Sequence, residues 1–308
     1  MPRSVGKPRT GYALMDITTP GNGIFRVVEK GQPRLQAQQT VVEHDGIEIT
    51  YTSAWRLGAD DWRTLLAVAA LAGLDGERFN GDDERQQQLT LWDHFLTEGV
   101  ARRRDALNLR TTAYAILRES GHTDTGDNRK RLSKSLDRLA AMHQTMRRGE
   151  KVMSGARLLG YAHDEESGEL AIGISPQMAR AIIGESRQFV RISLHEVRRL
   201  GDCAALLHAF LSARMRPGAT WHYPLDDLVS VAYGPEPCAP ATLRKRRERV
   251  RKALMEFAHW TTWEVSWDER RGPGGRSEWT VRVHRVSKAE LEAWEAQIAA
   301  ERLTAAEG

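Results

Sequence analysis

Seven basic residues crowd into positions 244–252, and their side chains have the chemistry to bind a polyanion. Only Glu248 and Val250 interrupt the run. Guanidinium and ammonium groups neutralise phosphates, and one arginine can donate two hydrogen bonds to a single guanine. Taken alone, such a run is more typical of a solvated helix surface. The elements around it must therefore decide between the two interpretations.

Helical spacing divides this run into an apolar side and a charged side. The apolar side collects four residues: Leu243, Val250, Leu254 and Phe257. The charged residues face away from them or lie on the two flanks, and we predict that they contact DNA: Arg244, Lys245, Glu248, Arg249, Arg251 and Lys252. A recognition helix in a major groove needs this division. Glu248 has two open roles, because it could accept a hydrogen bond from cytosine or hold a neighbouring arginine.

The elements expected on both sides of this helix favour DNA binding. Upstream, a short helix over 225–233 and a Pro-rich turn supply the other limb of a helix-turn-helix. Downstream, two alternating strands are joined by the turn RRGPGGR, which predicts a hairpin. Three arginines near its tip could reach a phosphate or the minor groove: Arg270, Arg271 and Arg276. A helix-turn-helix followed by such a hairpin is typical of a winged helix.

The first half of the chain has the same plan in a weaker form. We expect a short helix over 111–120 and a long helix from Asp127 to Arg148, whose apolar stripe includes His143 and Met146. On the opposite side and its flank we predict four DNA contacts: Lys130, Arg131, Lys134 and Arg138. The following hairpin turn, DEESGE, is acidic and would repel a DNA backbone. This half therefore binds DNA by its helix alone or serves mainly in protein contacts.

The repeated order of elements predicts an α+β protein made of two tandem winged-helix domains. The length of 308 residues suits two domains of ordinary size. We place a flexible basic arm at 1–40 and the first domain at 41–175. The second domain follows at 176–287, and a C-terminal helix occupies 288–308.

Composition and motifs argue against export and against catalysis. No apolar stretch approaches the ~18 residues that a membrane span needs, and the N-terminus lacks an apolar signal core. The two cysteines, Cys203 and Cys238, lie far apart, which fits a reducing cytoplasm. There is no phosphate-binding loop motif, and the ten histidines are scattered. We therefore expect a cytoplasmic protein that is not an enzyme, with no catalytic residues, no metal and no cofactor.

Three strings resemble the origin-binding replication initiators of IncQ-type plasmids, the RepC-like group: Leu57–Gly73, Gln188–Leu211 and Thr242–Leu254. The resemblance implies two winged-helix domains that bind direct repeats, called iterons, in double-stranded DNA at a plasmid origin. Binding would open an adjacent AT-rich region and admit a plasmid-encoded helicase and primase. The matching basic helix points to Arg244, Lys245, Arg249 and Lys252 as DNA contacts.

Two other functions stay open at this level. A winged-helix transcriptional repressor, acting on its own or a plasmid promoter, would use the same fold, but a dimeric repressor favours inverted half-sites. A scaffold protein could instead present the basic helix to an acidic partner. The expected terminal helix leaves self-association as a homodimer open as well.

Overall fold

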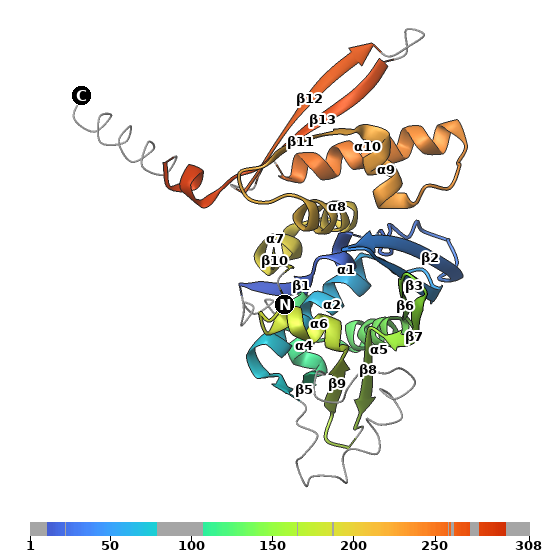
Figure 1. Cartoon of the computed structure of the whole chain (residues 1–308), viewed down its shortest axis with the longest axis vertical. Coiled ribbons are helices and arrows are strands. Elements are labelled where there is room, and N and C mark those ends of the chain that lie inside the picture. The colour runs from blue at the N-terminus through green and yellow to red at the C-terminus, as the bar shows by residue number, and fades with distance from the viewer. Residues whose placement is uncertain are drawn as a thin grey trace, which may run out of the picture.

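The structure is a computed structural model that describes residues 11–21, 23–78, 107–164, 166–186, 188–257, 259, 262–271 and 277–293. Its described elements form a mixed α/β arrangement in two stacked parts (Figure 1). The lower part in that view is built around helix α2, and the upper part around helices α8 and α10. Hairpin β12–β13 projects beyond α10 at the far end of the upper part (Figure 1).

Helix α2 (Ala59–Asp75) is the centre of the first part. Twelve of its 17 residues are buried, as expected of a helix that is apolar on nearly all sides. It packs against α4 (Ala113–Ser120), α5 (Gly126–Ala140) and several other elements. A helix enclosed in this way gives the surrounding elements a common core.

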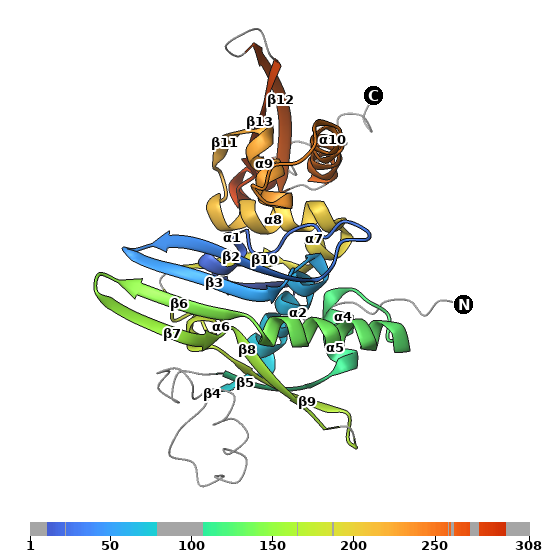
Figure 2. The ribbon, with the colours of Figure 1, turned by 90° about the vertical axis from the view of Figure 1, so that its right-hand side faces the viewer.

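Two four-stranded sheets flank this core. The first has the order β2-β3-β6-β7, from strands Leu35–His44, Ile47–Trp55, His143–Arg148 and Lys151–Arg157. The second has the order β4-β5-β9-β8, from strands Glu77–Arg78, Leu107–Thr112, Glu169–Ile174 and Leu159–His163. Every pairing in both sheets is antiparallel. Figure 2 shows the first sheet reaching away from α2 and α5.

Helices α4 and α5 form the expected short helix, turn and long helix. The hydroxyl of Thr112 caps α4 and that of Thr125 caps α5, since each accepts a hydrogen bond from the helix's first turn. Gly121 ends α4 with a φ of 86°, a left-handed conformation that glycine adopts without strain. Strands β8 and β9 then form the hairpin expected around the acidic turn.

The prediction that the long helix continues to Arg148 is wrong. Helix α5 ends at Ala140, and residues 143–148 form β6, which pairs with β3 and β7. His143 is exposed on that strand and is not part of a helical core stripe. Met146 continues the helical spacing of the apolar residues before it. It does pack half-buried against the core, but from a strand.

Much of the segment expected to be a flexible arm is folded. Strand β1 (Tyr12–Asp16) pairs with β10 (Phe189–Ser193), and a short helix, α1 (Thr18–Gly21), follows. The remaining arm residues lead into β2, which pairs with β3. Main-chain pairing and the buried side chains of Ala13, Met15, Ile24 and Phe25 hold the segment in place. Residues 1–10 lie outside the described residues.

The second part begins after α6 (Pro176–Ile182) and α7 (Leu194–Arg199), which pack with β1 and α2. It contains α8 (Asp202–Arg214), α9 (Leu225–Tyr233) and α10 (Pro240–Phe257). Its sheet has the order β11-β13-β12, from strands Thr220–Pro224, Ser277–Arg285 and Trp263–Arg271. Residues 288–293 are helical, and the rest of the expected C-terminal helix lies outside the described residues.

Candidate nucleic-acid interface

Helix α10 is anchored by one apolar side. Val250 and Leu254 are fully buried, and Leu243 is half-buried against the same core. The helix packs on α8, on α9 and on strand β12. This anchoring fixes which residues of the basic run face solvent, because positions about 180° away around the helix must point outward.

The outward side of α10 carries three exposed cations, Arg244, Lys245 and Lys252. Lys252 pairs with Glu248 one turn earlier, with its Nζ 3.1 Å from Glu248 Oε1. Glu248 thus holds a neighbouring basic residue, although the neighbour is a lysine and not an arginine. Arg244 and Lys245 make no ion pair or hydrogen bond with any residue that the structure describes. Their full charge is therefore available to a ligand.

One flank of α10 faces α9 and the hairpin. The guanidinium of Arg247 donates two hydrogen bonds to Asp226, at 2.6 and 2.5 Å, and these bonds raise the pKa of Arg247. Arg251 lies over the ring of Trp279, 4.3 Å from its centroid. This cation–π contact holds the side chain between the helix and the hairpin. Arg251 is half-buried as a result, so it is less accessible than Arg244.

The other flank of α10 meets Glu29, a residue for which sequence reasoning assigned no role. Glu29 Oε2 accepts a hydrogen bond from Arg246, and Glu29 Oε1 accepts one from Arg249, both at 3.0 Å. Arg249 was predicted as a DNA contact and remains exposed, but its charge is partly neutralised here. The position of Glu29 in a Gly- and Pro-rich stretch gave no signal of this contact.

The hairpin expected after α10 is present. Strands β12 and β13 pair without a break from Trp263 opposite Arg285 to Arg271 opposite Ser277. Arg270 and Arg271 therefore lie at the end of the ladder nearest the tip. The side chains of these two residues, and the whole of Arg276, lie outside the described part of the structure.

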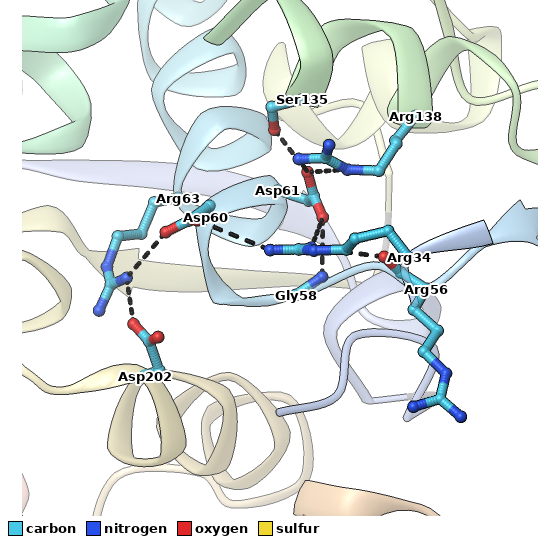
Figure 3. A network of polar contacts seen from close by, with 9 residues as sticks. All are labelled: Arg34, Arg56, Gly58, Asp60, Asp61, Arg63, Ser135, Arg138 and Asp202. Carbon is cyan, nitrogen blue, oxygen red and sulfur yellow. Dashed lines mark hydrogen bonds and ion pairs between the residues drawn. The ribbon is translucent and has the colours of Figure 1, made fainter. Parts of the chain in front are cut away.

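Helix α5 presents fewer cations than the sequence predicted. Lys130, Arg131 and Lys134 are exposed on it. Arg138 is turned inward, with a side chain that is only 12% exposed. Its Nη2 and Nε donate to Asp61 Oδ1 at 2.6 and 3.0 Å. The prediction of Arg138 as a DNA contact is therefore corrected, because a buried carboxylate holds its guanidinium inside the protein (Figure 3).

Asp61 is the centre of a polar network inside the first part (Figure 3). Its carboxylate is fully buried, and besides Arg138 it accepts from Ser135 Oγ at 2.6 Å, from Arg34 Nη1 at 3.1 Å and from the main-chain N–H of Gly58 at 2.7 Å. The network ties α2, α5 and the segment before β2 together. An aspartate near the start of a helix is common, so the sequence contained no signal of this network.

A second ion pair links α2 to the second part. Arg63 Nη1 donates to Asp202 Oδ1 at 2.8 Å, and Arg63 Nη2 donates to the carbonyl of Leu200 at 2.7 Å (Figure 3). Together with the contacts of Glu29, these bonds fix α8 and α10 relative to the first part. The two long helices, α5 and α10, lie toward the same side of the molecule (Figure 2).

Two kinds of feature are absent from the described ranges. No group of three or more histidine, cysteine or acidic side chains lies close enough to hold a metal ion. In the same ranges, no helix has both the length and the apolar character that crossing a membrane requires.

Two crystal structures of RctB are similar to this chain in fold. One contains selenomethionine derivatives of domains 2 and 3 of RctB, with a TM-score of 0.54 and 14% identity over 88% of this chain and 99% of that chain. The other contains RctB domains 2–3, with a TM-score of 0.51 and 14% identity over 90% and 99% of the two chains. No curated protein matches this chain in sequence.

The family comparison is more specific. The model of the family described as replication protein C (RepC) matches residues 13–270. This range includes all three strings that carried the resemblance in the sequence, Leu57–Gly73, Gln188–Leu211 and Thr242–Leu254. The match covers far more than half of the chain, which therefore belongs to the RepC family.

Proposed function

We propose that this protein is a plasmid replication initiator that binds direct repeats in double-stranded origin DNA without catalytic activity of its own. Membership of the RepC family supports the role in replication. The similarity of its fold to domains 2–3 of RctB agrees with this assignment. In this proposal α4–α5 and α9–α10 are the helix-turn-helix units of two tandem winged-helix domains, and each is followed by a hairpin that acts as a wing.

One observation carries the proposal: α10 is firmly anchored and has an outward side rich in cations. Arg244 and Lys245 are exposed and have no partner among the described residues, while their helix is held by Val250, Leu254 and the ion pairs on its flanks. Rigid presentation of charged side chains is what reading a major groove requires. A flexible or fully paired basic helix would not provide it.

The steps of initiation that follow binding are also part of the proposal. Binding at the repeats opens an adjacent AT-rich region, and a plasmid-encoded helicase and primase enter there. The protein acts in the cytoplasm as a monomer or as a homodimer. DNase footprinting separates this role from that of a repressor, because an initiator with two unlike units covers direct repeats, whereas a dimeric repressor protects inverted half-sites.

The test is the double substitution of Arg244→Ala and Lys245→Ala. Each base-reading contact that is lost should cost about 1–3 kcal/mol of binding free energy, and each phosphate contact should lower the salt slope by about one unit. Fluorescence anisotropy with repeat-containing and random DNA, at several salt concentrations, measures both quantities. Arg148→Ala with Lys151→Ala is the matched control, since it removes one arginine and one lysine that are likewise exposed and have no ion pair among the described residues. Wild-type affinity and salt slope in the α10 variant would refute the assignment.

A further inference from the structure

A cavity of about 340 Å³ lies beside α10, between the two parts of the molecule. One wall comes from residues between 26 and 39, which include the first residues of β2, and from Arg56. The other wall comes from the end of α9, the turn before α10 and Arg246. The volume falls at the lower end of the range for small-ligand sites, roughly 300–1,000 Å³. The cavity therefore has room for a small polar molecule or for part of a larger one.

Three guanidinium groups line this cavity, and most of their N–H donors have no acceptor among the residues that the structure describes. Arg26 donates to Glu236 at 2.7 Å and to the carbonyl of Gly23 at 2.9 Å. Arg56 donates to the amide oxygen of Gln32 at 2.5 Å and has no ion pair with any described residue. Each arginine carries five N–H donors. Arg26, Arg56 and Arg246 thus bring three positive charges to the wall of one small space.

Arg246 is held by an ion pair and an aromatic contact. One of its nitrogens donates to Glu29, and the guanidinium lies 4.9 Å from the centroid of the Tyr233 ring. Its Nε is buried and has no acceptor among the described residues. A buried donor without an acceptor is costly, and the cost is higher for a charged group. Because this nitrogen is inaccessible even to a water molecule, an anion in the cavity would meet the terminal Nη groups of Arg246.

The charge of the cavity wall also favours an anion. The three arginines are opposed by a single carboxylate of the wall, Glu236, and by Glu29 behind Arg246. Glu236 is largely exposed, with a side chain 66% accessible, so solvent screens much of its charge. The other titratable groups of the wall, Tyr233 and Cys238, add no positive charge. The balance is therefore positive on the inner side of the cavity.

We propose that this cavity binds a phosphate group between the two parts of the molecule. Planar guanidinium groups match phosphate oxygens in geometry and charge, and four glutamine side chains of the wall offer further hydrogen bonds. The phosphate comes from one of two sources, the backbone of DNA bound to α10 or a free nucleotide. Only the first source rests on the proposed function.

The sharpest variants are Ala37→Glu and Ala37→Gln in the full-length chain. Ala37 lies on the cavity wall and is exposed on β2, so both longer side chains can be accommodated without disturbing the core. They are matched in size and differ only in charge. We expect Ala37→Glu to weaken phosphate binding by about tenfold through like-charge repulsion, whereas Ala37→Gln stays near wild type. Arg56→Gln should weaken binding as well, since it removes a lining cation and breaks no ion pair.

The rate of alkylation of Cys238 by iodoacetamide reports occupancy of the cavity. Cys238 lies in the wall and is half-buried. The other cysteine of the chain, Cys203, is poorly reactive because burial raises its pKa to about 12, and the thiolate is the reactive form. Pyrophosphate, ATP and repeat-containing DNA are the three probes. Each probe that fills the cavity should slow alkylation of Cys238, and the Ala37→Glu variant should resist that protection.

The outcomes distinguish the two sources. Protection by pyrophosphate or ATP that Ala37→Glu weakens and Ala37→Gln retains identifies a free anion. Protection by DNA alone, with the salt slope of DNA binding lowered by about 0.9 in Ala37→Glu relative to Ala37→Gln, identifies a backbone phosphate. If no probe protects Cys238, or if both Ala37 variants behave alike, the proposal is overturned. Because pyrophosphate and ATP are tested without DNA, failure of DNA binding by α10 leaves their result interpretable.

Discussion

Helices α5 and α10 hold equivalent places in the order of elements but use their arginines in opposite ways. On α5, the most inward arginine binds the buried carboxylate of Asp61 in the centre of the first part. On α10, the arginines on the flanks bind acidic residues near the surface, Asp226 and Glu29, and the outward cations are left exposed. Equal sequence patterns therefore lead to unequal surfaces, because burial of one acidic partner decides where a guanidinium points.

This difference suggests a division of labour between the two helices. The ion pairs of Asp61 hold Arg138 of α5 inside the first part and also include Arg34. Arg34 lies close in sequence to Glu29, the residue that contacts α10. The outward cations of α10, in contrast, stay exposed. The acidic turn after β8 reinforces the contrast, since Asp164 accepts hydrogen bonds within the turn and its pKa is lowered by them. A turn that keeps its negative charge is a poor neighbour for a DNA backbone.

The largest expected effect is the difference in stability between removing Asp61 and removing Asp226. Asp61→Ala should lower the free energy of unfolding by about 3–5 kcal/mol, because it leaves the guanidinium groups of Arg138 and Arg34 without their buried carboxylate. Asp226→Ala removes the partner of Arg247 at the surface and should cost no more than about 1 kcal/mol. Urea denaturation followed by circular dichroism measures both. Equal losses of unfolding free energy in the two variants would contradict the contrast between the buried partner on α2 and the surface partner on α9.

The next effect concerns DNA affinity. Lys130→Ala with Lys134→Ala on α5 should weaken binding less than the Arg244→Ala and Lys245→Ala pair on α10, where each base-reading contact is worth about 1–3 kcal/mol. Both pairs remove two exposed cations, so the comparison is matched in charge. Anisotropy titrations of the same repeat DNA give the ratio. A larger loss on α5 would reverse the proposed division of labour.

A pH dependence is expected in the second part. Burial of Glu196 would raise its pKa, but the hydrogen bond and charge of His208 and the bond from Thr262 hold the pKa below the usual 4.5. The ionised form thus stabilises the folded state above that pH, and the contribution is lost as the pH falls through the lowered pKa. Glu196→Gln should be less stable than wild type at neutral pH, and the gap should narrow in acid. Thermal unfolding across this pH range provides the measurement.

The smallest expected effect comes from the i,i+4 pair on α10. Lys252→Ala removes an exposed ion pair with Glu248 and should change the free energy of unfolding by less than about 0.5 kcal/mol. If Lys252 contacts a phosphate, the salt slope of DNA binding should nevertheless fall by about one unit. An unchanged slope would restrict the contact surface of α10 to the turn that holds Arg244 and Lys245.

Helices with a clear apolar pattern were predicted well from the sequence. The pairing and packing between elements far apart in the chain were not. Helix α10 was recognised with its apolar side, because Val250 and Leu254 repeat at a clear helical interval. Helix α5 was extended too far, because Met146 continued that interval although main-chain pairing with β3 makes the segment a strand. Such pairing is set by residues nearly a hundred positions earlier, which local periodicity does not contain.

The contacts that define the candidate site were harder to foresee. Glu29 and Arg34 lie in a stretch of glycine, proline and glutamine that suggested a flexible arm. Their roles arise from long-range ion pairs with α10 and α2, which have no local signature in the sequence. The cavity beside α10 has the same origin, because its arginines come from three separate stretches of the chain.

The pairing of β1 with β10 joins two strands that the ribosome makes at different times. The partner of Tyr12 is Ser193, so β1 waits for most of the chain to be translated before it can form its hydrogen bonds. At roughly 5–20 residues per second this delay lasts on the order of 10 to 35 seconds. During that time Ala13 and Met15 lack their partners on β10, Ile192 and Val190. Strand β1 is thus synthesised long before β10, the strand that completes its pairing.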